Sequence, residues 1–270
     1  MIPKIIHYCW FSGDKKPEKI AQCIESWTQV MPDYQIKCWD ANSFDFDSVP
    51  FVKDAYARKR WAYVADYVRL YAIYTEGGIY LDSDVMVFKP FDDLLNDKMF
   101  IGLESCSYLY PQAAIFGAEK GNPILGDMLH CYYDKLTEPL TDDTLLRICK
   151  FDSAGREIFN DAGELQVAIA PVVFNYYFKK YGFKQEDTKQ ELEHVTVYPL
   201  PVFIDDASRV DETTYAIHLV CGSWLNPLYL DKKNIKGKLY RFCKRYRLFK
   251  TYAFIISVKK RLYKFIGKKI

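Results

Sequence analysis

The segment over 60–85 constrains this chain more than any other part of it. Its first half, 61–75, is apolar or aromatic on nearly every face, which predicts a helix that is buried all round. Gly77-Gly78 follows, and glycine is the usual residue just past a helix C-terminus. A short apolar strand then leads into Asp82-Ser83-Asp84, and we expect the apolar residues 85–88 to continue that strand.

The predicted buried helix contains only two charged residues, Asp66 and Arg69, which are three positions apart and so share one side. On an exposed helix they would form an ordinary ion pair worth a few tenths of a kcal/mol. On a helix without a polar face, removing such a pair from water costs more than the pair returns. We therefore expect the pair to face a polar cleft, where Arg69 can donate to phosphate or sugar oxygens and Asp66 can accept from hydroxyls.

The rest of the chain alternates strands and helices, which predicts an α/β fold. A strand over 2–10, a helix over 17–30 and a strand over 34–39 suggest a parallel unit at the N-terminus. The stretch 137–190 gives mixed signals of helix and loop. Further strands are expected over 99–103, 113–116, 195–198 and 215–220, and a further helix over 122–136.

Charge divides the chain into two parts. Residues 1–231 carry 22 Lys and Arg against 35 Asp and Glu, whereas residues 232–270 carry 15 Lys and Arg and no acidic residue. Half of the 270 residues are apolar, enough for one core, so we expect a single domain over 1–231. In 232–270 apolar residues recur at helical spacing, which predicts basic amphipathic helices that attach to an anionic membrane surface. The alternative is a helix folded onto the acidic body.

The sequence favours a location in the cytoplasm, peripheral on the inner face of the cell membrane. Its eight cysteines form no CxxC pair, the N-terminus lacks the pattern of a signal peptide, and the apolar run over 251–258 is too short to span a bilayer. No nucleic-acid partner is expected, because no recognition motif accompanies the basic residues.

Asp82 and Asp84 are candidate metal ligands. Two carboxylates at i and i+2 can converge on a hard divalent cation such as Mn²⁺ or Mg²⁺. A lone D-x-D is a weak signal, but here apolar strand residues flank it closely, and buried carboxylates need partners. His218, near the end of a late strand, could be a third ligand or a satisfied core residue. Tyr8 and Trp10 end the first strand, where ligands bind in open α/β sheets, although both could be core residues.

Four segments together resemble glycosyltransferase family 32, the family with a glycosyltransferase sugar-binding region containing a DXD motif. They are IPKIIHYCWFSG (2–13), RWAYVADYVRLYAIYTEGGIYLDSDV (60–85), GAEKGNPIL (117–125) and HLVCGSW (218–224). The resemblance implies a GT-A fold, Rossmann-like with a mixed central sheet. It also implies a UDP- or GDP-sugar donor, Mn²⁺ or Mg²⁺, and retention of the anomeric configuration.

The resemblance also implies roles for individual residues. Asp82 and Asp84 would hold the metal with His218, and Asp82 would also contact the donor ribose or sugar. Asp66 and Arg69 would bind donor sugar hydroxyls and, with the two DXD carboxylates, make up the catalytic group. The remaining nucleotide-sugar contacts would come from Tyr8, Trp10, Tyr80, Ser223 and Trp224. Relatives carry an Asn in the strand before GAEKG, where this chain has Gln112, so the preferred donor stays open.

The sequence therefore predicts a metal-dependent retaining glycosyltransferase acting on a lipid-linked oligosaccharide or a cell-surface polysaccharide. Two alternatives remain. A phosphatase of the haloacid-dehalogenase type also places D-x-D after an apolar strand, and Asp205-Asp206 could be its later acidic motif. A non-catalytic sugar-binding protein at the membrane would tolerate loss of Asp82 or Asp84.

Overall fold

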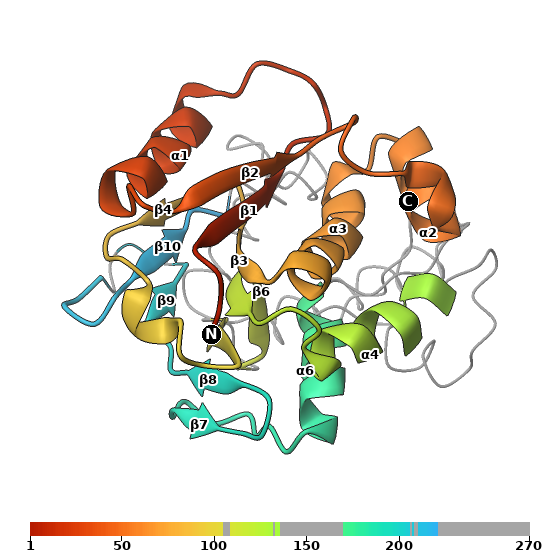
Figure 1. The fold of residues 1–270 in the computed structure, drawn as a ribbon. Helices are drawn as coiled ribbons and strands as arrows, with labels where there is room; N and C mark the ends of the chain where they lie inside the picture. The colour runs from red at the N-terminus through yellow and green to blue at the C-terminus, as the bar shows by residue number, and fades with distance from the viewer. Residues whose placement is uncertain (105–108, 132, 136–169, 206, 208–209, 221–270) are drawn as a thin grey trace, which may run out of the picture.

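The computed structural model describes residues 1–104, 109–131, 133–135, 170–205, 207 and 210–220 (Figure 1). Ser223, Trp224 and the basic segment 232–270 lie outside these residues, so the predictions made for them stay predictions. No helix in the described part has the length and apolar character needed to cross a membrane. The helices are α1 (Glu18–Val30), α2 (Pro50–Ala57), α3 (Trp61–Glu76), α4 (Pro123–Cys131) and α6 (Ala170–Lys180), with short 3-10 turns η1 (Phe46–Ser48), η2 (Asp92–Leu94) and η3 (Tyr133–Lys135).

A seven-stranded mixed sheet forms the centre of the fold, which confirms the predicted α/β class. In spatial order its strands are β2 (Gln35–Trp39), β1 (Ile5–Cys9), β3 (Gly78–Leu81), β6 (Pro111–Ala118), β5 (Met99–Leu103), β8 (Thr196–Tyr198) and β7 (Gln190–Glu191). Strands β2, β1 and β3 are parallel, whereas β6 is antiparallel to both of its neighbours. The β1–α1–β2 unit is the parallel unit that the sequence predicts.

A second, three-stranded sheet corrects one expectation about the strand after the DXD motif. Residues 85–88 do not continue β3; β4 (Val85–Val87) instead pairs with β10 (Ala216–His218), which also pairs with β9 (Phe203–Ile204). The chain turns at the motif, where the Val85 amide donates to the Asp82 carbonyl oxygen at 2.9 Å. Helix α1 then holds β4, because the Trp27 indole donates to the Val85 carbonyl oxygen at 2.8 Å.

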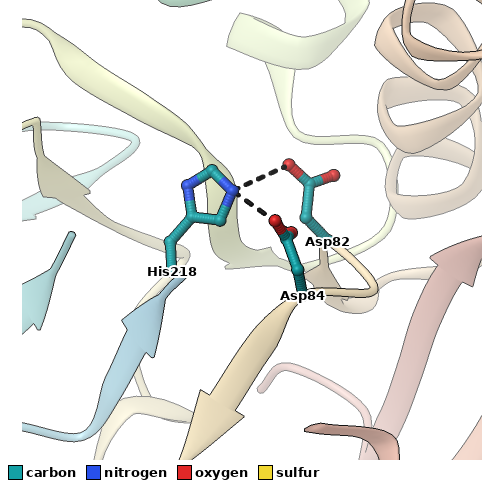
Figure 2. Close-up of side chains that lie close together, drawn as sticks. All are labelled: Asp82, Asp84 and His218. Atoms are coloured by element: carbon teal, nitrogen blue, oxygen red, sulfur yellow. Dashed lines mark ion pairs between the residues drawn. The ribbon is translucent and has the colours of Figure 1, made fainter. Parts of the chain in front are cut away.

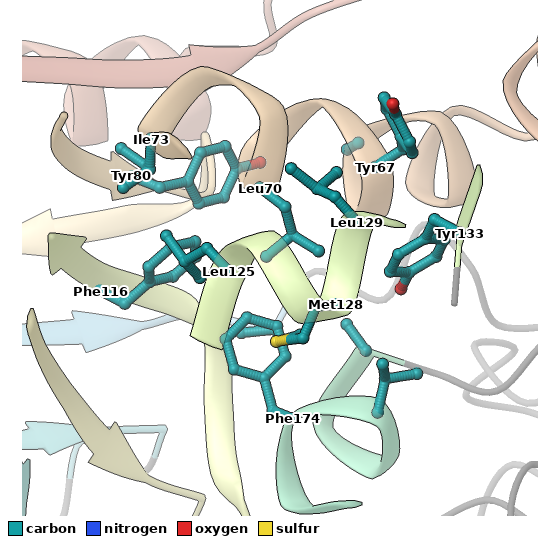
Figure 3. Packing of buried hydrophobic residues seen from close by; sticks show 14 of the residues in the cluster. Tyr67, Leu70, Ile73, Tyr80, Phe116, Leu125, Met128, Leu129, Tyr133 and Phe174 are labelled. Atoms are coloured by element: carbon teal, nitrogen blue, oxygen red, sulfur yellow. The ribbon is translucent and has the colours of Figure 1, made fainter. Parts of the chain in front are cut away.

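Two apolar clusters cover the two faces of the sheet. On one face the indole of Trp27, fully buried on α1, packs edge-on against Tyr8 of β1. On the other face α3 lies against the sheet, with α4 and α6 beside it (Figures 1 and 3). Helix α3 contacts β1 and β3 as well as α2 and α4. Contacts on several sides explain why its sequence is apolar all round.

The sequence predicts the described elements unevenly. The bounds of α1, α3 and β5 agree with expectation to within one residue. Helix α2 was not anticipated, and α6 lies in the stretch whose signals are mixed. Both helices complete the large cluster behind α3 and have no pattern as regular as that of α3.

A buried histidine fixes the end of α3 against β1. The Trp39 indole donates to Nδ1 of His7 at 3.1 Å, so Nε2 carries the proton and donates to the Gly77 carbonyl oxygen at 2.9 Å. Burial lowers the pKa of His7, which favours this neutral form. Gly78 then passes so close to β1 that an added Cβ would lie 2.6 Å from the Ile5 carbonyl oxygen.

The Gly78→Ala substitution should therefore lower the free energy of unfolding by about 2 to 4 kcal/mol, because a left-handed backbone strains Ala and overpacking adds a similar cost. Gly121→Ala is the matched control, since Gly121 also has a positive φ, +75° against +110°, but open space around its Cβ position. It should cost about 1 kcal/mol. Urea unfolding measures both values, and equal losses would contradict the close approach.

Candidate active site

The DXD motif lies at the junction of the two sheets. Asp82 follows β3, Asp84 precedes β4, and His218 ends β10, directly across the antiparallel pairing from Val85. The Leu219 amide donates to the Asp84 carbonyl oxygen at 3.0 Å, which ties the end of β10 to the motif. Residues more than 130 positions apart in the sequence therefore face each other (Figure 2).

The side chains of Asp82, Asp84 and His218 converge as a metal site requires. One ligand atom from each lies within 4.8 Å of the others. Nε2 of His218 is 3.2 Å from Asp84 Oδ1 and 3.9 Å from Asp82 Oδ2. Two carboxylates and an imidazole form a donor set that suits Mn²⁺ or Mg²⁺, so the residues fit the predicted cation. The structure thus brings together the three residues that the sequence singled out.

Arg69 lies behind Asp82, within the core. Its NH2 nitrogen is 3.0 Å from Asp66 Oδ1 and 3.5 Å from Asp82 Oδ1. Nε donates to the Ala65 carbonyl oxygen at 3.0 Å, and NH1 donates to the Ala113 carbonyl oxygen at 2.7 Å. Arg69 and Asp66 are only 5% and 7% exposed. The pair is therefore no surface ion pair, and Arg69 joins it to Asp82 of the DXD motif. That the pair contacts a bound sugar or phosphate stays a prediction.

Burial governs the electrostatics of these groups. It raises the pKa of Asp66 to about 7, with Arg69 opposing the shift and Asp82 adding to it. Burial alone would lower the pKa of Arg69, but the charges of Asp82, Tyr80 and Asp66 raise it by more. The net shift is upward, so the guanidinium stays charged. Burial likewise lowers the pKa of His218, and hydrogen bonding to Asp84 with the nearby negative charges leaves it raised overall. A metal ion would take the place of that proton.

The predicted nucleotide-binding aromatics occupy different settings. Tyr8 is buried on the α1 face of the sheet. Trp10 is half-buried just beyond β1, and its indole donates to the Asp14 carbonyl oxygen at 2.8 Å. Lys16 lies 5.4 Å from the ring centroid of Trp10 and 5.6 Å from that of Tyr8. Tyr80 is buried, and its hydroxyl donates to Asp82 Oδ1 at 2.9 Å.

Two further residues, Asp205 and Gln112, have surroundings that suggest a role at or near the site. Asp205 follows β9, whose parallel pairing aligns Ile204 with Ile217, so Asp205 comes next to His218 in register and adds to the rise in the pKa of its imidazole. A pair of acidic residues after a short apolar strand is the signal for it in the sequence. Gln112 is buried, and its Nε2 has no hydrogen-bond partner among the described residues.

Comparison with known proteins finds a family match over the region that contains α3 and the DXD motif. Residues 17–101 match the family described as "Glycosyltransferase sugar-binding region containing DXD motif". This match covers about a third of the chain, including α3 and the DXD motif. This chain is 31% identical over 137 residues to "Inositol phosphoceramide mannosyltransferase 3" of Schizosaccharomyces pombe. The alignment covers 46% of this chain and 35% of that protein. The chain thus spans about a third of the length of that curated relative.

Two solved glycosyltransferase structures also align with this chain. "PaToxG Glycosyltransferase" aligns with a TM-score of 0.46 and 20% identity, covering 66% of this chain and 68% of the other. The galactosyltransferase LgtC, solved with donor and acceptor sugar analogs, aligns with a TM-score of 0.45 and 12% identity, covering 88% and 94%.

The three-residue cluster makes a direct prediction about metal binding. Mn²⁺ should raise the melting temperature of the wild-type protein, because a ligand that binds only the folded state stabilises it by mass action. Asp84→Asn should abolish most of this rise, since it removes a charged ligand while keeping the side-chain size. Thermal unfolding with and without Mn²⁺ measures both.

The control is Asp33→Asn, which removes an exposed carboxylate paired with Lys4. It should keep the full response to Mn²⁺. An Asp84→Asn protein that responds like the wild type would show that the cation binds elsewhere.

Proposed function

We propose that this protein is a metal-dependent retaining glycosyltransferase with a GT-A fold, which moves a sugar from a nucleotide-sugar donor to an acceptor hydroxyl. The observation that carries the proposal is the convergence of Asp82, Asp84 and His218 beside the buried Asp66–Arg69 pair, within a family defined by its sugar-binding region. A phosphatase has no evident use for that pair on α3.

The metal-ligating residues would serve the leaving group. Asp82, Asp84 and His218 would hold Mn²⁺ or Mg²⁺, which when bound supplies Lewis-acid stabilisation to the diphosphate. Asp66 would accept hydrogen bonds from donor sugar hydroxyls, with Arg69 holding it in place. The base would stack near Trp10, at the edge where β1, β2 and β3 all present their carboxyl ends. Ser223 and Trp224 are proposed to donate to the departing diphosphate.

Transfer is proposed to proceed by front-side displacement. The acceptor oxygen forms a bond to the anomeric carbon on the face from which the diphosphate oxygen leaves, and the acceptor proton passes to that departing oxygen. The configuration is thereby retained. The transition state carries positive charge on the sugar ring, which the nearby carboxylates of Asp66 and Asp82 would stabilise.

A panel of UDP- and GDP-sugars with Mn²⁺ tests the proposal directly. One nucleotide class should stabilise the wild-type protein in a Mn²⁺-dependent manner and give release of the nucleoside diphosphate. Asp84→Ala should reduce this release by at least a hundredfold, because the diphosphate charge loses its stabilisation, whereas Asp33→Asn should not. Substantial activity in Asp84→Ala would contradict the metal assignment, and an aspartyl-phosphate intermediate would favour the phosphatase.

The acceptor is proposed to be a glycan or a lipid-linked oligosaccharide at the inner face of the cell membrane, and the support is the charge of residues 232–270. Each Lys or Arg near an anionic bilayer contributes about 1 kcal/mol. Replacing six basic residues of this segment by Gln should therefore weaken flotation of the protein with anionic vesicles by more than tenfold. The six are Lys259, Lys260, Arg261, Lys264, Lys268 and Lys269.

Zwitterionic vesicles are the control for flotation, and neither protein should bind them tightly. Unchanged flotation of the substituted protein with anionic vesicles would show that the segment is not the membrane anchor and would favour its packing on the acidic body.

A further inference from the structure

The two carboxylate oxygens of Asp82 lie in different surroundings. Oδ1 accepts from the Tyr80 hydroxyl at 2.9 Å and lies 3.5 Å from NH2 of Arg69. Oδ2 faces the other way, 3.9 Å from Nε2 of His218, toward the candidate metal position (Figure 2). One oxygen is thus held by the protein interior, and the other is presented to the cation.

The groups that hold Oδ1 are themselves fixed. The Tyr80 ring is 1% exposed and packs against Phe116 with 5.7 Å between ring centroids. The Arg69 guanidinium lies over the Tyr80 ring, 4.9 Å from the ring centroid. Backbone carbonyl oxygens of Ala65 and Ala113 accept from Arg69, so it cannot swing away without losing them. The hydroxyl of Tyr80 therefore approaches Asp82 from a rigid support.

We propose that Tyr80, together with Arg69, is a positioning residue that orients Asp82 so that Oδ2 alone is offered to the metal. The inference rests on the proposed function, because it concerns the same metal site. Groups that hydrogen-bond to a metal-ligating carboxylate fix its orientation and typically change metal affinity by 10–100-fold. Tyr80 would then act through Asp82, a role distinct from contact with the nucleotide.

Tyr80→Phe tests this with minimal disturbance, because it removes only the hydroxyl and keeps the buried ring. Tyr67→Phe is a matched control: Tyr67, on α3, is buried too, but its hydroxyl donates to Asp134 Oδ1 at 2.8 Å and not to an aspartate of the DXD motif. Mn²⁺ affinity is measured by electron paramagnetic resonance of the free ion. Tyr80→Phe should weaken it tenfold or more, whereas Tyr67→Phe should change it less than twofold.

Comparing the Mn²⁺ concentration for half-maximal transfer with kcat at saturating Mn²⁺ separates a positioning role from a general structural effect. In Tyr80→Phe the Mn²⁺ concentration for half-maximal transfer should rise tenfold or more, while kcat at saturating Mn²⁺ stays within threefold of the wild type. Wild-type Mn²⁺ affinity in a folded Tyr80→Phe protein would overturn the proposal, as would a loss of affinity of equal size in Tyr67→Phe.

If the wild type binds no Mn²⁺, that result counts against the proposed function and does not test the role of Tyr80. A crystal structure of metal-free Tyr80→Phe tests that role separately. The Asp82 carboxylate should then rotate away from its wild-type orientation. A carboxylate left unchanged would show that Tyr80 does not orient it.

Discussion

The buried charge of Arg69 is the constraint on which the rest of the site depends. A guanidinium inside the core must be matched by carboxylates and carbonyl oxygens, since an unpaired buried charge is very costly. Asp66, Asp82 and the Ala113 carbonyl oxygen supply this match from α3, the end of β3 and β6. One side chain therefore ties together three elements that meet at the carboxyl edge of the sheet.

The turn at the DXD motif brings the second sheet, and with it His218, next to the two carboxylates. By leaving the main sheet after Leu81, the chain lets β4 pair with β10, and β10 brings His218 to Asp84. Had residues 85–88 continued β3, β4 could not have paired with β10, and His218 would not lie opposite Val85 beside the motif. The hydrogen bond from Trp27 of α1 to β4 makes this departure part of the core packing.

Acidic groups outnumber basic ones at this junction. Asp66, Asp82 and Asp84 lie around one arginine and one histidine. Burial raises the pKa of Asp66 to about 7, and the charge of Asp82 adds to the rise. A divalent cation would neutralise the excess. The apolar clusters on both faces of the sheet offset the cost of holding such a site in place.

The sequence by itself determined the α/β class, the buried α3 and the candidate ligands Asp82 and Asp84, because all of these follow from local periodicity and spacing. It also marked Asp66 and Arg69, since charge on an apolar helix demands a partner. Only the tertiary structure decided that Asp82 is this partner and that Tyr80 holds one of its oxygens. The second sheet, and the approach of His218 to the motif, likewise depend on strand pairing between distant segments, which local patterns do not specify.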